Sequence, residues 1–334
     1  MIGALLGRVY GAAAAERRQW YARHPSRVRR LARPVVSVGN LRVGGSGKTP
    51  VTAYIARLLV RQGERPAILS RGYRRANPQN GVTVVSDTTG VRADVDTAGD
   101  EPLMLARELP GVPVLVATER ARAGQMAEER YGATVHILDD GFQHLQLARD
   151  IDLLLIAEAD LAELVLPGGL LRESIDTASV ADAVLVSDPD DAAAARVVEQ
   201  LGPREAFQVV RAFRAPRTLL DNTETSIGGT RVLAVSGIAR PERFVHDLSG
   251  AGVIVAGSMA FPDHHRYTRG DIDRILETAR QASADLIVTT HKDAVRLERF
   301  SWTEIPAVYL PLDVRVTPEA RFSDWLLERL RACR

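Results

Sequence analysis

Short apolar runs alternate with helix-like stretches along most of the chain. Runs of strand length lie at 35–38, 67–70, 82–86, 114–117, 134–138, 151–156 and 183–187. Helical patterns lie between many of them, for example at 50–62, 101–108 and 120–130. This alternation predicts an α/β fold with a mostly parallel sheet that is covered by helices on both faces.

The pattern changes after residue 205. Segments 206–213 and 217–220 have extended character, Pro216 lies between them, and the polar stretch 221–230 follows. We interpret 206–230 as an extended linker between a larger domain at 34–205 and a smaller α/β domain at 231–334. In the smaller domain, strands are predicted at 232–236, 253–256, 286–289 and 307–310, and helices begin near Pro241, Gly270 and Pro318.

Residues 1–33 predict an amphipathic helix on a membrane surface. Apolar residues at helical spacing form one stripe, which consists of Ile2, Leu5, Leu6, Val9, Tyr10 and Ala13. Trp20 and Tyr21 follow, and the segment contains eight arginines against one acid, Glu16, although the net charge of the whole 334-residue chain is only +1. Such a helix suits the headgroup region of an anionic leaflet.

Two other interpretations of this segment stay open. An ordinary helix that packs on its own domain would show the same periodicity. A nucleic-acid-binding arm would be equally basic, but no recognisable nucleic-acid module follows it, so we expect no nucleic-acid partner. No apolar run reaches the roughly 18 residues that cross a bilayer, which makes a peripheral protein the expectation.

The amino-acid composition limits which chemical sites the chain can form. Cys333 is the only cysteine, which excludes intrachain disulfides and cysteine-rich zinc sites. Of the 43 basic residues, only Lys48 and Lys292 are lysines. A lysine in so arginine-rich a chain is a candidate for chemistry that a guanidinium group cannot perform.

A glycine-rich stretch between a predicted strand and a predicted helix has the context of a phosphate-binding loop. Its residues are Arg42, Val43, Gly44, Gly45, Ser46, Gly47, Lys48 and Thr49. Glycines let backbone N–H groups approach phosphates, and a helix N-terminus adds positive potential. Lys48 would reach the β- and γ-phosphates, and the Thr49 hydroxyl would hold Mg²⁺. The strict pattern has glycine where this chain has Arg42, so the loop opens differently.

Acidic residues are predicted at the same sheet edge. Asp139 and Asp140 follow an apolar strand, and one or both carboxylates would hold Mg²⁺. A polar turn after a strand is the simpler alternative. Arg172 and Glu173 follow a glycine pair, where Arg172 would neutralise a phosphate and Glu173 would assist the metal; a surface turn is the alternative here.

Two further motifs are candidates for acid–base chemistry. Asp100 starts a predicted helix and is most simply its N-cap. His264, in the run Phe261-Pro262-Asp263-His264-His265, would serve as the base that accepts a hydroxyl proton, unless this run is an inert loop or a zinc site. Lys292 and Asp293 are adjacent, unlike the corresponding pair of a GTPase, and a structural role for Lys292 stays open.

Taken together, the motifs resemble the tetraacyldisaccharide 4′-kinase family of Gram-negative bacteria. The resemblance covers nearly the whole chain and rests on -VGGSGKTP-, -SRGY-, -GDEP-, -LDDGFQH-, -LPGGLLRE-, -FPDHH- and -THKDA- in this order. Gly168 and Leu170 depart from the family pattern, but Arg172 and Glu173 remain.

The resemblance implies an activity and a set of roles. The reaction is ATP- and Mg²⁺-dependent phosphorylation of the 4′-hydroxyl of an acylated glucosamine disaccharide 1-phosphate, which gives lipid IVA, by a peripheral enzyme on the cytoplasmic face of the inner membrane. Asp100 and His264 would form the catalytic pair. ATP and Mg²⁺ would be held by Lys48, Thr49, Asp139, Asp140 and Glu173, and phosphate or headgroup contacts would come from Arg71, Arg120 and Arg172.

Two rival functions follow from the residues alone. One is a membrane-recruited NTPase that hydrolyses ATP to drive a partner, and the other is a kinase for a soluble small molecule. Nothing in the sequence requires an obligate protein partner.

Overall fold

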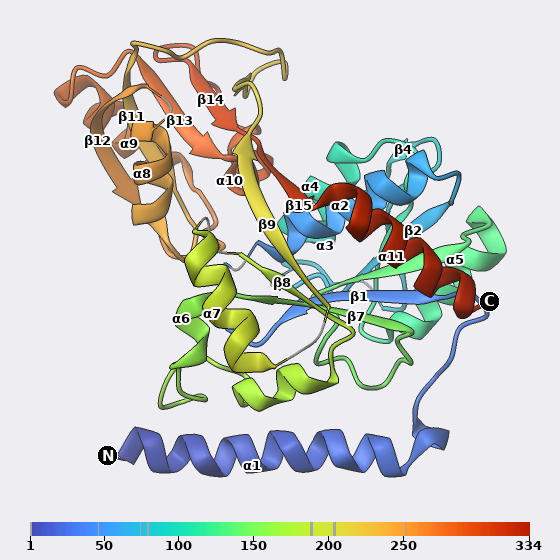
Figure 1. Ribbon diagram of the computed structural model, residues 1–334. Coiled ribbons are helices and arrows are strands. Elements are labelled where there is room, and N and C mark those ends of the chain that lie inside the picture. Colours follow the sequence, from blue (N-terminus) through green and yellow to red (C-terminus); the bar gives the residue numbers. More distant parts are fainter. Residues whose placement is uncertain are drawn as a thin grey trace.

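Two sheets organise the protein, and a long helix lies along the larger one (Figure 1). The computed structural model describes residues 2–45, 47–73, 75–78, 80–187, 190–202, 205–250 and 252–334. Among these, the large sheet has ten strands in the order β15-β9-β8-β7-β1-β6-β2-β5-β3-β4, and the small sheet has five in the order β10-β14-β13-β11-β12. The α/β fold class with an N-terminal helix is confirmed.

The strands match most of the predicted ranges. The large sheet contains β1 (Val35–Asn40), β2 (Pro66–Ser70), β3 (Thr83–Asp87), β4 (Gly90–Val91), β5 (Val114–Val116), β6 (Val135–Asp139), β7 (Ile151–Ile156), β8 (Ala183–Val186), β9 (Glu205–Phe213) and β15 (Leu312–Thr317). The small sheet contains β10 (Arg217–Thr218), β11 (Arg231–Ser236), β12 (Ile254–Ala260), β13 (Leu286–Thr290) and β14 (Ala307–Leu310). From β9 through β2 to β5 the neighbours are parallel, as predicted.

Helices cover both faces of the large sheet. Those of this part are α2 (Lys48–Arg61), α3 (Val95–Ala98), α4 (Asp100–Glu108), α5 (Arg120–Tyr131), α6 (Glu158–Leu161), α7 (Asp191–Leu201) and α11 (Glu319–Ala332), with a 3₁₀ turn at η2 (Ile175–Val180). One core joins Val36 of β1 with Ile55 of α2 and Phe322 of α11. The opposite core places Val35 with Ala127 of α5, because successive side chains of a strand point to opposite faces.

The chain passes between the two sheets twice, which differs from the expected domain limits. β9 was expected in the linker at 206–230, yet it pairs in parallel with β8 inside the large sheet. After the small sheet, β15 returns and pairs antiparallel with β9, and α11 packs on the large sheet. Residues 312–332 therefore belong with the large sheet instead of the segment 231–334. β9 and β15 are about a hundred residues apart in sequence, so no local pattern links them.

The small sheet carries its own helices. These are α8 (Pro241–Gly250), α9 (Arg269–Gln281) and α10 (His291–Leu297). The predicted starts near Pro241 and Gly270 agree with α8 and α9, and the start near Pro318 agrees with α11. Helix α10 follows β13 directly, with the Thr290 hydroxyl as its N-cap. In Figure 1 this unit, coloured orange to red, lies at the upper left of the view.

Helix α1 (Ile2–Arg23) contacts the body through glycines. Gly3, Gly7 and Gly11 recur every fourth residue and face the segment 165–168. A Cβ on Gly7 would lie 2.7 Å from the carbonyl oxygen of Val165, so only glycine allows this close approach. A 3₁₀ turn, η1 (Pro25–Arg27), then leads toward β1.

The apolar stripe of α1 is mostly exposed, and its last two residues, Tyr10 and Ala13, also line a cleft of the protein. Leu5 and Val9 are each 64% exposed, and Leu6 and Tyr10 are also exposed. Among the residues that the structure describes, no helix has the length and apolar character needed to cross a membrane.

Candidate active site

The phosphate-binding loop connects β1 to α2, as its sequence context predicts. Gly44 and Gly47 have positive φ angles of 94° and 86°, which glycine adopts without strain. Gly47 is the N-cap of α2, so the helix N-terminus opens onto the loop. Lys48 Nζ donates to Asn40 Oδ1 at 2.9 Å and lies 3.5 Å from Asp140 Oδ1. Ser46 lies outside the described residues.

Arg42 anchors the loop. Its guanidinium lies 3.0 Å from Asp160 and 3.4 Å from Glu163, and it is not among the residues that line the neighbouring cleft. The structure therefore gives Arg42 a bracing position behind the cleft, where the sequence suggested a phosphate contact.

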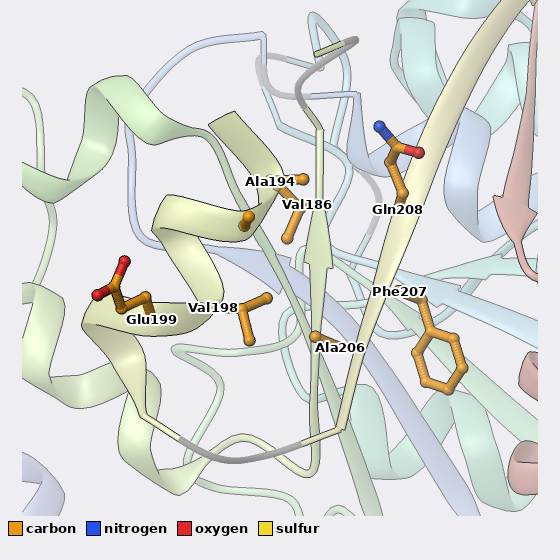
Figure 2. Close-up of a pocket in the computed structure, with 8 residues that line it drawn as sticks. Val186, Ala194, Val198, Glu199, Ala206, Phe207 and Gln208 are labelled. Atoms are coloured by element: carbon orange, nitrogen blue, oxygen red, sulfur yellow. The ribbon is translucent and has the colours of Figure 1, made fainter. Parts of the chain in front are cut away.

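A cleft of about 1110 Å³ lies between the two sheets. Predicted site residues line it from the large-sheet side, namely Val43, Gly44, Gly45, Gly47, Lys48, Thr49, Arg71, Arg120, Asp139, Asp140, Arg172 and Glu173. His264 lines it from the small-sheet side. A second hollow, of about 440 Å³, lies between α7 and strands β8 and β9 (Figure 2); its lining is mostly apolar and contains none of these residues.

The two adjacent carboxylates differ in their environment. Asp139 is buried and accepts a hydrogen bond from the Thr52 hydroxyl at 3.1 Å. Burial, reinforced by the charges of Glu101 and Asp140, raises the pKa of Asp139 to about 7. Burial also acts on Asp140, but Lys48 and Arg172 outweigh it and hold the pKa of that carboxyl below its usual value. A cation near Asp139 would relieve this buried negative charge.

Arginines give the cleft a positive field. Arg172 Nη1 lies 2.9 and 3.0 Å from the two carboxylate oxygens of Asp140, and the buried Arg120 donates to the Asp140 carbonyl oxygen at 3.1 Å. Burial and the nearby arginines, first Arg120, lower the pKa of His144 to about 3. A cavity wall that disfavours further positive charge suits a phosphorylated ligand.

Glu173 does not face an open coordination position. Arg18 of α1 donates from Nε to Oε2 at 2.9 Å and from Nη2 to Oε1 at 3.0 Å, so both carboxylate oxygens are engaged. The same guanidinium lies 4.7 Å from the ring centre of Phe142. No pattern along the chain indicates that α1 reaches this far into the site.

Asp100 and His264 come together from the two units. His264 Nδ1 and Asp100 Oδ2 are 3.0 Å apart, and both side chains are buried. Asp100 is the first residue of α4, and Gly99 takes the N-cap position, so Asp100 is not the simple helix cap that its position in the sequence suggested. Arg296 Nε lies 2.5 Å from the other oxygen of Asp100 and compensates its charge.

The other motif residues have structural contacts. Asp293 accepts from the Gly237 N–H, the Tyr267 hydroxyl and the Thr290 hydroxyl. His265 contacts Asp271 in the cap of α9, 3.1 Å away.

Sequence reasoning missed several residues of the site. Asn40 and Arg18 contact predicted site residues, Lys48 and Glu173, but belong to no chemical pattern of their own. Glu101 and Asp263 lie within the motifs -GDEP- and -FPDHH-, but no role was assigned to them, although the charge of Glu101 acts on Asp139 and Asp263 lies 3.8 Å from His264. Three further arginines also line the cleft, namely Arg211 of β9 in the large sheet and Arg240 and Arg243 of the small-sheet unit. Lys292 could be singled out from the sequence, because it is one of only two lysines in the chain.

Fold and site together define a P-loop α/β protein of the phosphotransferase type, in which the histidine of a buried Asp–His pair and a phosphate-binding loop line one cleft. The chain matches, over residues 1–331, the family described as "LpxK: Tetraacyldisaccharide-1-P 4'-kinase", and it belongs to that family. The predictions that the chain belongs to this family and that it is a kinase are confirmed.

Curated relatives are similar in sequence to most of this chain. A tetraacyldisaccharide 4′-kinase of Syntrophus aciditrophicus is 37% identical over 334 residues, covering 94% of this chain and 89% of the relative. One of Anaeromyxobacter dehalogenans is 42% identical over 301 residues, covering 86% and 79%. The crystal structure of "apo" form LpxK from Aquifex aeolicus in complex with ATP has a TM-score of 0.78 at 30% identity and covers 97% of both chains.

Proposed function

We propose that this chain transfers the γ-phosphoryl group of ATP to the 4′-hydroxyl of a tetraacyldisaccharide 1-phosphate on the cytoplasmic face of the inner membrane. One observation carries the proposal: His264, which is paired with the buried Asp100, and the loop residue Lys48 line the same cleft from its two sides. That arrangement suits transfer between two bound substrates better than hydrolysis alone.

The loop residues 43–49 would bind the triphosphate, as the ATP complex of the Aquifex aeolicus relative supports. Backbone N–H groups and the N-terminus of α2 neutralise phosphate oxygens, and the Lys48 ammonium is placed to neutralise the terminal group. Arg71, Arg120 and Arg172 line the cleft and would contact phosphates of either substrate. Negative charge that develops on the transferring group is stabilised by such fixed cations, which are worth several kcal/mol in a water-poor site.

The residues present fit a magnesium ion. Among the described residues no group of three or more His, Cys, Asp or Glu side chains could hold a metal. Mg²⁺ typically takes one or two carboxylates and completes its shell with phosphate oxygens and water. Asp139, Asp140 and the Thr49 hydroxyl would hold it, and when bound it would supply charge neutralisation for the triphosphate. Glu173 would join only after release from Arg18.

The acceptor hydroxyl needs a base. Nε2 of His264 would take the proton of the 4′-hydroxyl while Asp100 holds Nδ1–H and stabilises the imidazolium that forms. Arg296 Nε, 2.5 Å from Oδ1 of Asp100, holds this buried carboxylate in place. In this scheme the O–H bond breaks as the oxygen bonds to phosphorus, and ADP leaves.

The position of α1 supports a membrane site for the acceptor. Its glycine face contacts the protein, Leu5, Leu6 and Val9 of its apolar stripe are exposed, and the last residues of the stripe, Tyr10 and Ala13, line the cleft itself. Burial of a Leu or Val side chain in the acyl region contributes about 1.5–3 kcal/mol each. A helix packed only for stability would hide this stripe.

A turnover assay separates transfer from hydrolysis. ADP release is measured with and without tetraacyldisaccharide 1-phosphate in mixed micelles, for the wild type and His264→Ala. We expect acceptor-dependent turnover in the wild type and a kcat roughly 10²–10⁴ lower in the variant. ADP release at the same rate without acceptor would favour an NTPase that drives a partner, and activity independent of lipid or detergent would favour a soluble acceptor.

A further inference from the structure

Lys292 lies on the far side of the His264 ring from Asp100. Its Nζ is 3.1 Å from His264 Nε2 and 2.8 Å from Asp263 Oδ1, and Glu101 is 3.6 Å away. The two ring nitrogens of His264 are therefore both engaged, one by a carboxylate and one by the lysine. The atom that would accept the hydroxyl proton is the one that contacts Lys292.

The contact fixes the direction of the hydrogen bond. Burial disfavours the Lys292 ammonium, but Glu101, Asp263 and Asp100 outweigh burial and raise the pKa of Lys292 above its ordinary value. An ammonium group has no lone pair and can only donate. Nε2 must then accept, so it carries no proton, and the neutral ring has its proton on Nδ1, toward Asp100.

Charged groups from three parts of the described chain surround this ring. Helix α4 contributes Asp100 and Glu101, and α10 contributes Lys292 and Arg296. Asp263 precedes the histidine in its own loop, 3.8 Å from Nε2, and the ring of Tyr73 packs edge-on at 5.6 Å. Lys292 contacts the ring directly, whereas Arg296 contacts Asp100 and affects the ring through that carboxylate.

We propose that Lys292 is a positioning residue whose ammonium keeps Nε2 of His264 free of a proton and aimed into the cleft until the acceptor hydroxyl replaces it. This inference rests on the proposed function. When the hydroxyl arrives, its O–H donates to Nε2, and Lys292 keeps its contacts with Asp263 and Glu101. The proton then passes from oxygen to Nε2 as the oxygen bonds to the γ-phosphorus, and ADP leaves with the electron pair of the broken P–O bond.

The role explains why lysine is retained here. An ammonium is a compact charge that turns between Asp263, Glu101 and the ring, whereas a guanidinium presents a rigid planar fork. Lys292 is thus set apart from the 41 arginines by the geometry of its three neighbours.

The first test is the pH profile of kcat/KM for Lys292→Met and Lys292→Arg. Removing the ammonium favours the imidazolium, so in Lys292→Met the acid limb moves up by about 1–2 pH units and kcat/KM on that limb falls about 10–100-fold. The loss shrinks as the pH rises above the limb. Lys292→Arg keeps the charge, and its acid limb stays near that of the wild type. A loss of equal size at every pH would show a structural role and overturn the proposal.

The double variant Lys292→Met/His264→Ala locates the effect. If Lys292 acts through the histidine, its substitution changes kcat/KM little once His264 is alanine, and the two losses are strongly non-additive. A full additional loss in the alanine background would place Lys292 on a phosphate instead and refute its action through the ring.

A measurement without turnover keeps the proposal separate from the proposed function. In the wild-type protein labelled with ¹⁵N-histidine, the signals absent from His264→Ala are those of His264. We expect an unprotonated Nε2 and a protonated Nδ1 at neutral pH. A proton on Nε2 would overturn the proposal even if the enzyme transfers phosphate, and the expected tautomer would stand even if the acceptor proved to be another compound.

Discussion

The ion pair between Arg18 and Glu173 predicts that one side chain fastens α1 to the active site. The perturbation is Arg18→Ala, with Arg8→Ala as the control. Both variants remove one arginine from the same helix, so attraction to an anionic membrane falls equally, by about 1 kcal/mol. Only Arg18 contacts Glu173, because Arg8 is exposed on the first turns of α1.

The magnitude follows from the burial of the pair. The side chains of Arg18 and Glu173 are 16% and 7% exposed. Removing one partner of a fully buried pair costs about 3–5 kcal/mol, whereas an exposed pair contributes about 0–1 kcal/mol. For this largely buried pair with two charge-assisted hydrogen bonds, we expect about 2 kcal/mol. That free energy corresponds to a roughly 30-fold change in an equilibrium constant.

Hydrogen exchange of the α1 backbone measures this equilibrium. In Arg18→Ala, protection of amides in the second half of α1 should fall roughly 30-fold, and kcat should fall as well because α1, which lines the cleft, is no longer fastened beside it. Arg8→Ala should leave both quantities near the wild type in detergent. Equal protection in the two variants would refute the view that this ion pair fastens the helix.

Three further predictions concern the loop, the metal and the membrane. Lys48→Ala should lower kcat at least 10²-fold with little change in Tm, because the terminal phosphate loses a fixed charge; wild-type turnover would remove Lys48 from the mechanism. Because the pKa of Asp139 is raised to about 7, Mg²⁺ must displace a proton below that pH. The Mg²⁺ affinity measured by calorimetry should therefore rise up to tenfold per pH unit toward pH 7 and level off above it. An affinity that does not change with pH would contradict Asp139 as a metal ligand. Replacing the exposed residues Leu5, Leu6 and Val9 of α1 with glutamine should reduce cosedimentation with anionic vesicles, while the same change at the exposed Leu220 should not. Equal vesicle binding by the two variants would argue against a membrane helix.

Sequence patterns predicted the parts of the fold that depend on neighbours in the chain. Strands β7 and β14 have the predicted limits, because β7 is apolar except for Asp152 and β14 is a short apolar run between Pro306 and Pro311. Strand β15 was missed because its residues alternate in burial and its partner β9 lies a hundred residues earlier. The placement of β9 and β15 in the large sheet depends on contacts between distant parts of the chain, which no local pattern encodes.

The site was predictable where a motif carries its own geometry. The glycine loop, the carboxylates after β6 and the base in the small-sheet unit all lie at one cleft, as their positions after strands predict. Contacts between units were not predictable. Arg18 reaches Glu173 across 155 positions, and Asp100 meets His264 across 164, because pairing at such separation depends on the packed fold.

The most direct test of the central claim is the transfer of label from γ-³²P-ATP to tetraacyldisaccharide 1-phosphate, followed by mapping of the labelled position. We expect one labelled lipid with its new phosphate at the 4′-oxygen, formed by the wild type and lost in Lys48→Ala and in His264→Ala. Label that appears only as inorganic phosphate, or a labelled lipid formed equally well by His264→Ala, would contradict transfer between the glycine loop and the histidine.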